Sequence, residues 1–154
     1  MNKIIRNTPL DPEKSRRESF AMMLDYAKDY EDKKCDIVFF HNSWKEAVYN
    51  VVLFVEEMFS RNIKYGRKND TNCFEFSIFK SVSVKFMNSH YSFNLPKKTY
   101  FNMAVFDNFD EFMRTSSRTL MSGVKFGNII LIVDDIKEGT DTIALGEIEF
   151  DVVD

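Results

Sequence analysis

The feature that most constrains the fold is a short apolar run that leads through three polar residues directly into a helix. The run Cys35–Phe40 (CDIVFF) has the length of a buried strand, and His41-Asn42-Ser43 follows it. Ser43 and Glu46 have the spacing of a capping box, in which the Ser hydroxyl accepts from the Glu amide and the Glu reaches back to the Ser amide. The expected apolar face of the helix comprises Ala47, Val48, Val51, Val52, Val55, Met58 and Phe59. A strand that passes straight into a helix favours an α/β fold.

A second helix is predicted near the start of the chain. Asp11-Pro12 is a favourable helix start, because Asp caps well and Pro is tolerated in the first turn. The apolar stripe of this helix comprises Phe20, Met23, Leu24, Ala27 and Tyr30. Residues 1–10 are expected to form a flexible arm, and residues 11–154 a single domain. A short helix over Asn108–Met113 and a Ser/Thr-rich connection over 114–126 are also expected.

Several further segments are predicted to be strands. Apolar residues occupy even positions from Phe74 to Phe86, which is the period of a half-buried strand. The run is long for one strand, so a bend or hairpin is expected near Lys80-Ser81. The other expected strands are Tyr100–Phe106, Gly127–Asp135 and a final hairpin around Gly146, and residues 62–72 are expected to form a loop. The sequence therefore predicts a layered α/β domain with a mixed sheet of about five strands flanked by two main helices.

Composition excludes several classes of protein. The 154 residues include two cysteines, too few for a disulfide framework or a zinc site. Neither a signal peptide nor an apolar stretch of about 20 residues is visible, so we expect a cytoplasmic protein without a membrane partner. His41 and His90 are far apart, and no spacing indicates a catalytic Ser/His/Asp or Cys/His arrangement.

The run GNIILIVDD, residues 127–135, is an apolar strand that ends in two acids. Together with the strand–loop–helix unit at 35–59, it resembles the P-loop ATPase core of phage terminase large subunits, over residues 35–135. The resemblance implies an anion site at Ser43 and Lys45 and a magnesium ion held by Asp134 and Asp135. However, the loop has no glycine, and Glu46 stands where the family has the magnesium-binding hydroxyl. We therefore expect no ATP hydrolysis, and a degenerate nucleotide-binding domain stays an alternative.

The acids after this strand raise a second alternative, a metal-dependent nuclease. Asp134 and Asp135 are followed by Lys137, and hard cations such as magnesium bind converging carboxylates. An Asp followed by Glu-x-Lys on a strand, the order of a common nuclease core, is absent here. Magnesium is the one cofactor that the sequence brings into consideration.

Charge is distributed unevenly along the chain. Residues 61–128 carry 11 basic and 5 acidic side chains, a net charge of +6, whereas residues 129–154 have a net charge of −7. The two segments either attract each other in the fold or leave a basic binding surface. The best candidate surface comprises Arg61, Lys64, Tyr65, Arg67 and Lys68. The sequence thus favours a non-catalytic accessory protein that binds a phage or host protein, or a nucleic acid.

Overall fold

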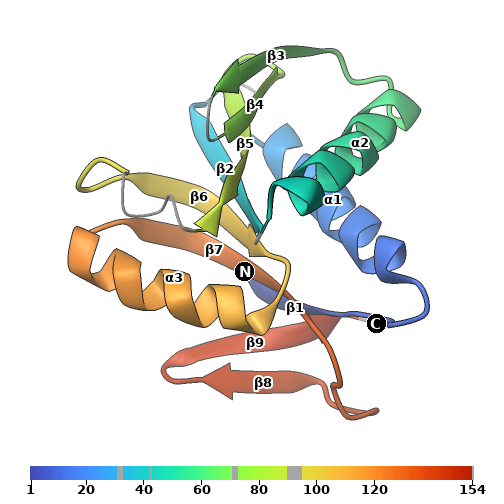
Figure 1. Ribbon diagram of the computed structural model, residues 1–154, viewed down its shortest axis with the longest axis vertical. Helices are drawn as coiled ribbons and strands as arrows, with labels where there is room; N and C mark the ends of the chain where they lie inside the picture. The colour runs from blue at the N-terminus through green and yellow to red at the C-terminus, as the bar shows by residue number, and fades with distance from the viewer. Residues whose placement is uncertain (31–32, 42, 71–72, 90–94, 154) are drawn as a thin grey trace.

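The computed structural model describes residues 1–30, 33–41, 43–70, 73–89 and 95–153, apart from the side chains of residues 117–122. The described residues form three helices and one mixed sheet of nine strands (Figure 1). The strand order across the sheet is β3-β4-β5-β2-β6-β7-β1-β9-β8. The helices are α1 (Pro12–Lys28), α2 (Trp44–Ser60) and α3 (Phe109–Ser122). The strands are β1 (Asn2–Arg6), β2 (Cys35–His41), β3 (Tyr65–Asp70), β4 (Cys73–Ile78), β5 (Val82–Asn88), β6 (Tyr100–Phe106), β7 (Lys125–Val133), β8 (Thr142–Leu145) and β9 (Ile148–Val153). The α/β class with a mixed sheet is confirmed, but the expected five strands and two helices are too few.

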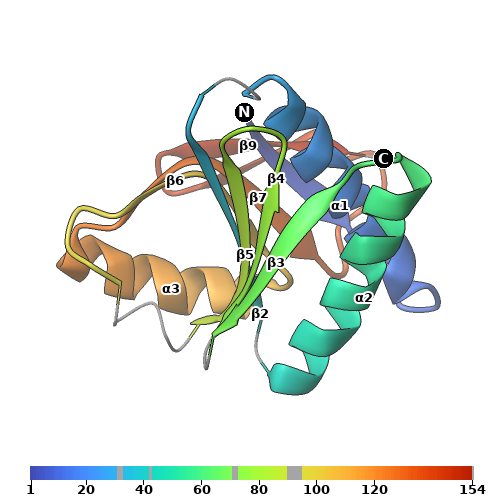
Figure 2. The ribbon, with the colours of Figure 1, turned by 90° about the horizontal axis from the view of Figure 1, so that it is seen from above.

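The six strands β5-β2-β6-β7-β1-β9 run parallel. The antiparallel strands β4 and β3 extend the sheet at one end, and the antiparallel strand β8 extends it at the other. Helices cover both faces, with α1 and α2 on one side and α3 on the other (Figure 2). Parallel strands covered on both faces are buried and read as continuous apolar runs, as β2 and β7 do.

The N-terminal segment differs from the expected flexible arm. Asn2–Arg6 forms β1, which pairs in parallel with β7 on one side and β9 on the other. Ile4 and Ile5 point to opposite faces and are both buried. Two adjacent apolar residues are enough for a strand when both of its edges are paired, and the polar residues around them mask it in the sequence.

Helix α2 begins as predicted, because the Ser43 hydroxyl accepts a hydrogen bond from the Glu46 amide at 3.3 Å. Its buried face is narrower than the expected one and is shifted around the helix. The buried residues are Ala47, Asn50, Val51, Leu53, Phe54 and Met58, whereas Val48, Val52 and Phe59 are exposed. The apolar positions lie around much of this helix, so their spacing could not indicate which side meets the sheet.

The segment expected to be a loop over residues 62–72 contains β3, a strand at the edge of the sheet. All six residues of β3 are exposed, which explains why Tyr65–Asp70 shows no apolar alternation. The hairpin predicted near Lys80-Ser81 is confirmed, since β4 and β5 pair in antiparallel register on either side of it.

Two further boundaries differ, and one prediction holds. Helix α3 continues to Ser122, through the expected Ser/Thr-rich connection, and β7 begins at Lys125. The final hairpin is confirmed at Gly146, whose φ of 65° lies in the left-handed region that favours glycine in tight turns.

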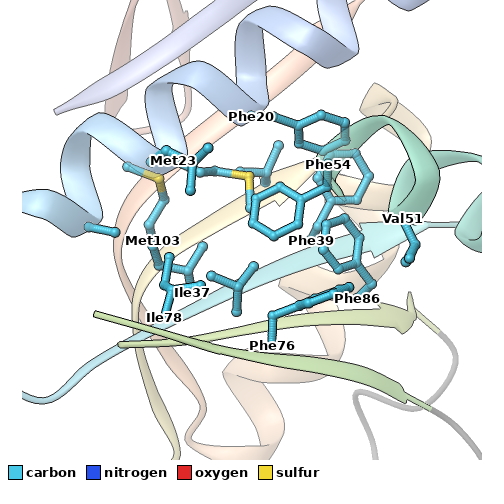
Figure 3. Packing of buried hydrophobic residues seen from close by; sticks show 14 of the residues in the cluster. Phe20, Met23, Ile37, Phe39, Val51, Phe54, Phe76, Ile78, Phe86 and Met103 are labelled. Carbon is cyan, nitrogen blue, oxygen red and sulfur yellow. The ribbon is translucent and has the colours of Figure 1, made fainter. Parts of the chain in front are cut away.

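The sheet separates two apolar cores. The larger one, under α1 and α2, contains a cluster of phenylalanines in which the rings of Phe39 and Phe86 stack with centroids 5.5 Å apart (Figure 3). Phe20 from α1 and Phe54 from α2 complete this cluster. The smaller core, under α3, includes Phe106. These cores hold the carboxyl ends of the parallel strands in fixed positions.

Candidate functional site

The candidate site lies where the carboxyl ends of β2 and β6 meet. The chain leaves β2 into α2 on one face of the sheet and leaves β6 into α3 on the opposite face. Open α/β sheets bind ligands at such a topological switch point, because the two diverging connections leave a crevice between the strands. His41 ends β2 and Asp107 follows β6, so both residues occupy this point.

Three carboxyl groups gather around this point. The Asp107 side chain is hydrogen-bonded to Glu46, and the charge of Glu111 acts on it as well. Burial raises the pKa of Asp107 to about 7, the negative charges of Glu46 and Glu111 add to this, and Arg16 opposes it. The carboxyl group of Asp107 therefore takes up a proton close to neutral pH.

Glu111 connects this cluster to the other face of the sheet. Its side chain is fully buried, and its carboxylate accepts a hydrogen bond from the Ser89 hydroxyl, which follows β5. Arg114 lies 3.6 Å from the second carboxylate oxygen, and the Glu111 amide donates to the Asn108 side chain at 2.8 Å. Asn108 thus caps α3 and fixes the first turn that carries Glu111.

His41 is buried beside this cluster at the end of β2. Burial lowers the pKa of its imidazole to about 4, and a backbone hydrogen bond at Ser43 opposes this shift. The ring is therefore neutral at physiological pH and is not a cationic partner for the carboxyl groups. Its Nδ1 atom has no hydrogen-bond partner among the described residues.

The connection from β1 to α1 carries a pattern that the sequence analysis did not identify. Residues Thr8–Ser15 (TPLDPEKS) match the spacing G-x-x-x-x-G-K-[ST] between a strand and a helix, with both glycines replaced. Thr8 stands at the first glycine position and Glu13 at the second. Glycine at these positions allows the backbone to wrap a phosphate, and a glutamate there repels one.

Arg16 occupies the space beside this loop. Its guanidinium donates to the Asn7 side chain at 3.0 Å, to the Ser15 hydroxyl at 3.1 Å and to the Pro12 carbonyl at 3.3 Å. It also reaches the Asp107 carbonyl at 3.5 Å. Ser15 is the residue of the pattern that would bind a magnesium ion, together with an acid at the sheet edge. Because a guanidinium already contacts Ser15 and the Asp107 backbone, these residues do not fit a magnesium–nucleotide complex.

The residues predicted from the sequence lie around this edge without forming one site. Ser43 caps α2, and Lys45 is exposed in the first turn of that helix. Asp134 and Asp135 are exposed after β7, where Asp134 accepts a hydrogen bond from the Asn7 side-chain amide at 2.5 Å. In the described part of the chain, no three His, Cys, Asp or Glu side chains converge in a group that could hold a metal ion.

The predicted basic surface is only partly available. Arg61 forms ion pairs with Asp25 at 2.7 Å and with Glu57 at 3.0 Å, so its charge is neutralised. Arg67 lies over the rings of Phe74 and Phe76, at 5.3 and 5.8 Å from their centroids.

The other members of this set stay exposed. Lys64, Tyr65 and Lys68 lie on or beside β3, and Lys68 is opposite Glu75 in the register of β3 and β4.

One sequence signal could have located the carboxyl cluster. Tyr100–Phe106 is a predicted strand, and Asp107 directly follows it, as Asp134 follows β7. The prediction favours Asp134 and Asp135 because their strand is the longer apolar run. The length of the run does not decide which acid is buried, and the structure buries Asp107 and exposes Asp134.

Comparisons with known proteins agree with the fold. No protein-family model matches the sequence, and no curated protein matches it. Two solved structures of the large terminase from a thermophilic bacteriophage, one of them in complex with ADP, are similar to the structure. Each gives a TM-score of 0.50 at 14% sequence identity and covers 84% of this chain. The distant resemblance to a terminase-type core is confirmed at the level of the fold.

The chain spans about a third of the length of those terminase chains, since the match covers 33% of each. In the described residues, no helix is both long and apolar enough to cross a membrane.

Proposed function

We propose that this chain is a non-catalytic interaction protein on a terminase-like fold, which binds a protein or nucleic-acid partner and does not turn over a nucleotide. The observation that carries this proposal is the guanidinium of Arg16, which contacts Asn7, Ser15 and the Asp107 backbone at the edge where a nucleotide would bind. A cation supplied by the chain itself replaces the metal ion that phosphate chemistry needs.

Two further features support the absence of catalysis. Glu13, in the first turn of α1, stands at the second glycine position of the pattern, so a side chain is present where the backbone would have to approach a phosphate. The pKa of Asp107 is raised to about 7, so this carboxyl group is partly protonated at neutral pH and is a poor ligand for a divalent cation. The alternative of a metal-dependent nuclease has no support in the geometry of the described acids, because no three of them are placed to hold a metal ion together.

The test is an assay for ATP hydrolysis and binding. Phosphate release from Mg-ATP by the purified chain should equal that of a buffer blank, and calorimetry should detect no binding at millimolar ATP. The variants Lys14→Ala and Lys45→Ala probe the two candidate loops separately. Turnover that either variant abolishes would refute the proposal and identify the loop responsible.

We propose that the partner binds β3 and Lys64, the basic residue that directly precedes this strand. The excess of basic side chains in this part of the chain favours this position. Every residue of β3 is exposed, and an edge strand offers unpaired backbone groups as well as side chains. Arg67 and Lys68 provide the basic character, whereas Arg61 contributes little because it is ion-paired.

Charge reversal tests this surface. Binding partners are isolated from a host lysate with the native chain, with and without nuclease treatment. The double variant Arg67→Glu/Lys68→Glu should bind less than a tenth of the amount of partner that the native chain binds. The matched control is Lys14→Glu/Lys137→Glu, which makes the same charge change on two other exposed lysines. Equal retention by both double variants would show that β3 is only a solvated edge.

A further inference from the structure

A basic hollow lies at the opposite edge of the sheet from the carboxyl cluster, at the amino ends of β2 and β6. It is an open cavity of about 550 Å³, and all of its lining residues belong to the described part of the chain. Three lysines contribute to its wall: Lys34 before β2, Lys85 on β5 and Lys98 before β6. Lys85 and Lys98 lie in the basic segment 61–128, but none of the three lysines is among the residues of the best candidate surface on and beside β3.

The charges of this hollow are only partly balanced by the described residues, since Glu75 lies opposite Lys85 in the register of β4 and β5. No described acidic side chain forms an ion pair with Lys34, Lys85 or Lys98, and Asp36 is the one acid that lines the cavity. Three ammonium groups around one carboxylate attract an anion that carries more than one charge, such as a chain of phosphates.

An aromatic ring accompanies the lysines. Tyr100 lines the cavity and is 51% exposed, which is unusual for a large aromatic residue at the start of an inner strand. Its ring lies across Gly127 of β7, where a Cβ atom would come within 3.1 Å of the Tyr100 Cζ atom. The glycine therefore leaves the space in which the ring lies against the strand, and the remaining surface of the ring faces solvent.

The wall that carries Lys98 is held in place. The Thr99 amide donates to the Pro96 carbonyl at 3.2 Å, and the Lys125 amide donates to the Thr99 carbonyl at 3.0 Å. The Thr99 hydroxyl adds a third hydrogen bond, to the Pro96 carbonyl at 2.6 Å. A ligand would thus meet a preformed turn, and little ordering entropy would be lost on binding.

We infer that this hollow binds single-stranded nucleic acid, with phosphates at Lys34, Lys85 and Lys98 and one base stacked on Tyr100. Basic grooves combined with exposed aromatic rings bind single strands, because an unpaired base offers its face for stacking and a duplex does not. An acidic protein segment would form ion pairs with the lysines, but its carboxylates would not stack on the ring of Tyr100. The inference names a surface separate from β3 and does not depend on it.

The experiment measures fluorescence anisotropy of a labelled oligothymidine of about 20 nucleotides, longer than the site of one small domain, at several salt concentrations. Lys85→Glu/Lys98→Glu should weaken binding more than tenfold and reduce the slope of log K against log salt by about 1.4, the loss expected for two phosphate contacts to a single strand. Tyr100→Ala should weaken binding about tenfold through lost stacking, whereas Tyr100→Phe should stay within about twofold of the native chain.

Three comparisons make the test decisive. The control Lys28→Glu/Lys137→Glu changes the net charge equally at two exposed lysines that do not line the hollow and should leave the affinity within about twofold. Gly127→Ala, checked for folding by thermal unfolding, should lose affinity like Tyr100→Ala without any change of charge. The inference is overturned if the control loses as much affinity as the lysine variant, if Tyr100→Ala has no effect, or if duplex DNA or polyglutamate binds as tightly. ATP turnover bears only on the proposed function, so the two failures are distinguishable.

Discussion

Replacing Asp107 by Asn should make the protein more stable, by an amount that depends on pH. The carboxyl group has a pKa of about 7 in the folded chain against an ordinary value of 3.8, so the folded state holds a proton that the unfolded state has released. Stability contributed by this group therefore falls as pH rises from about 4 to about 7, and it stays low above that range. An amide resembles the protonated acid and carries no such penalty.

The size of the effect follows from the two pKa values. A difference of about three pKa units corresponds to about 4 kcal/mol in the free energy of unfolding at pH 8. At pH 5 the expected gain is about 2 kcal/mol, and near pH 3 it vanishes because the acid is protonated in both states. These are upper values, because the amide must also keep the hydrogen bond to Glu46.

Urea unfolding at pH 8, 5 and 3 measures this dependence. Asp135→Asn serves as the control, because it removes an exposed acid on the same side of the sheet. His41 changes stability in the opposite sense as pH falls from about 6.5 to about 4, since its pKa is lowered in the folded chain, so the native and variant proteins must be compared at each pH. If Asp107→Asn destabilises the chain equally at all three pH values, Asp107 is ionised in the folded state and the reasoning is wrong.

Three further predictions concern packing and capping. Ser43→Ala should lower the free energy of unfolding by about 1 kcal/mol through loss of the cap on α2. Val51→Ala should cost more, about 2 kcal/mol, whereas Val52→Ala should cost little because Val52 is exposed; equal midpoints in urea for the two valine variants would contradict the assigned buried face. Phe39→Ala should cost about 3–5 kcal/mol, as measured by chemical unfolding, because the ring packs against Phe20 and Phe86. A loss below about 1 kcal/mol would show that the phenylalanine cluster is not the main core.

Local patterns predicted the elements that have a strong period or a chemical boundary signal. The cap at Ser43, the alternation from Phe74 to Phe86 and the turn at Gly146 all identify structure through neighbouring residues alone. Strands that form because a neighbouring strand pairs with them, and not through apolar alternation of their own, were missed. β1 is a strand because β7 and β9 pair with it, and β3 is a strand because β4 pairs with it, although neither segment alternates in sequence.

The candidate site shows the same division. The sequence predicted that acidic residues directly after apolar strands form the candidate site. This principle is correct, because parallel strands direct the residues that follow them to one edge of the sheet. The charges that act on buried Asp107 belong to Glu46, Glu111 and Arg16, which come from three different helices. Likewise, the basic hollow assembles lysines that are 51 and 13 residues apart, Lys34 to Lys85 and Lys85 to Lys98, and charge counting along the chain could not join them.

The position of β1 has a consequence for the order in which the molecule can form. This strand leaves the ribosome well before its partners, because β7 and β9 follow it by more than 120 residues in the chain. Until those strands are synthesised, Ile4 and Ile5 have no place to be buried, and both edges of β1 stay open. Long-range parallel pairing of this kind is slow, because a large loop must close before the contacts that stabilise it exist. The nascent chain therefore carries an unpaired strand while the residues between are made, and the central sheet is completed only after the β8–β9 hairpin has emerged.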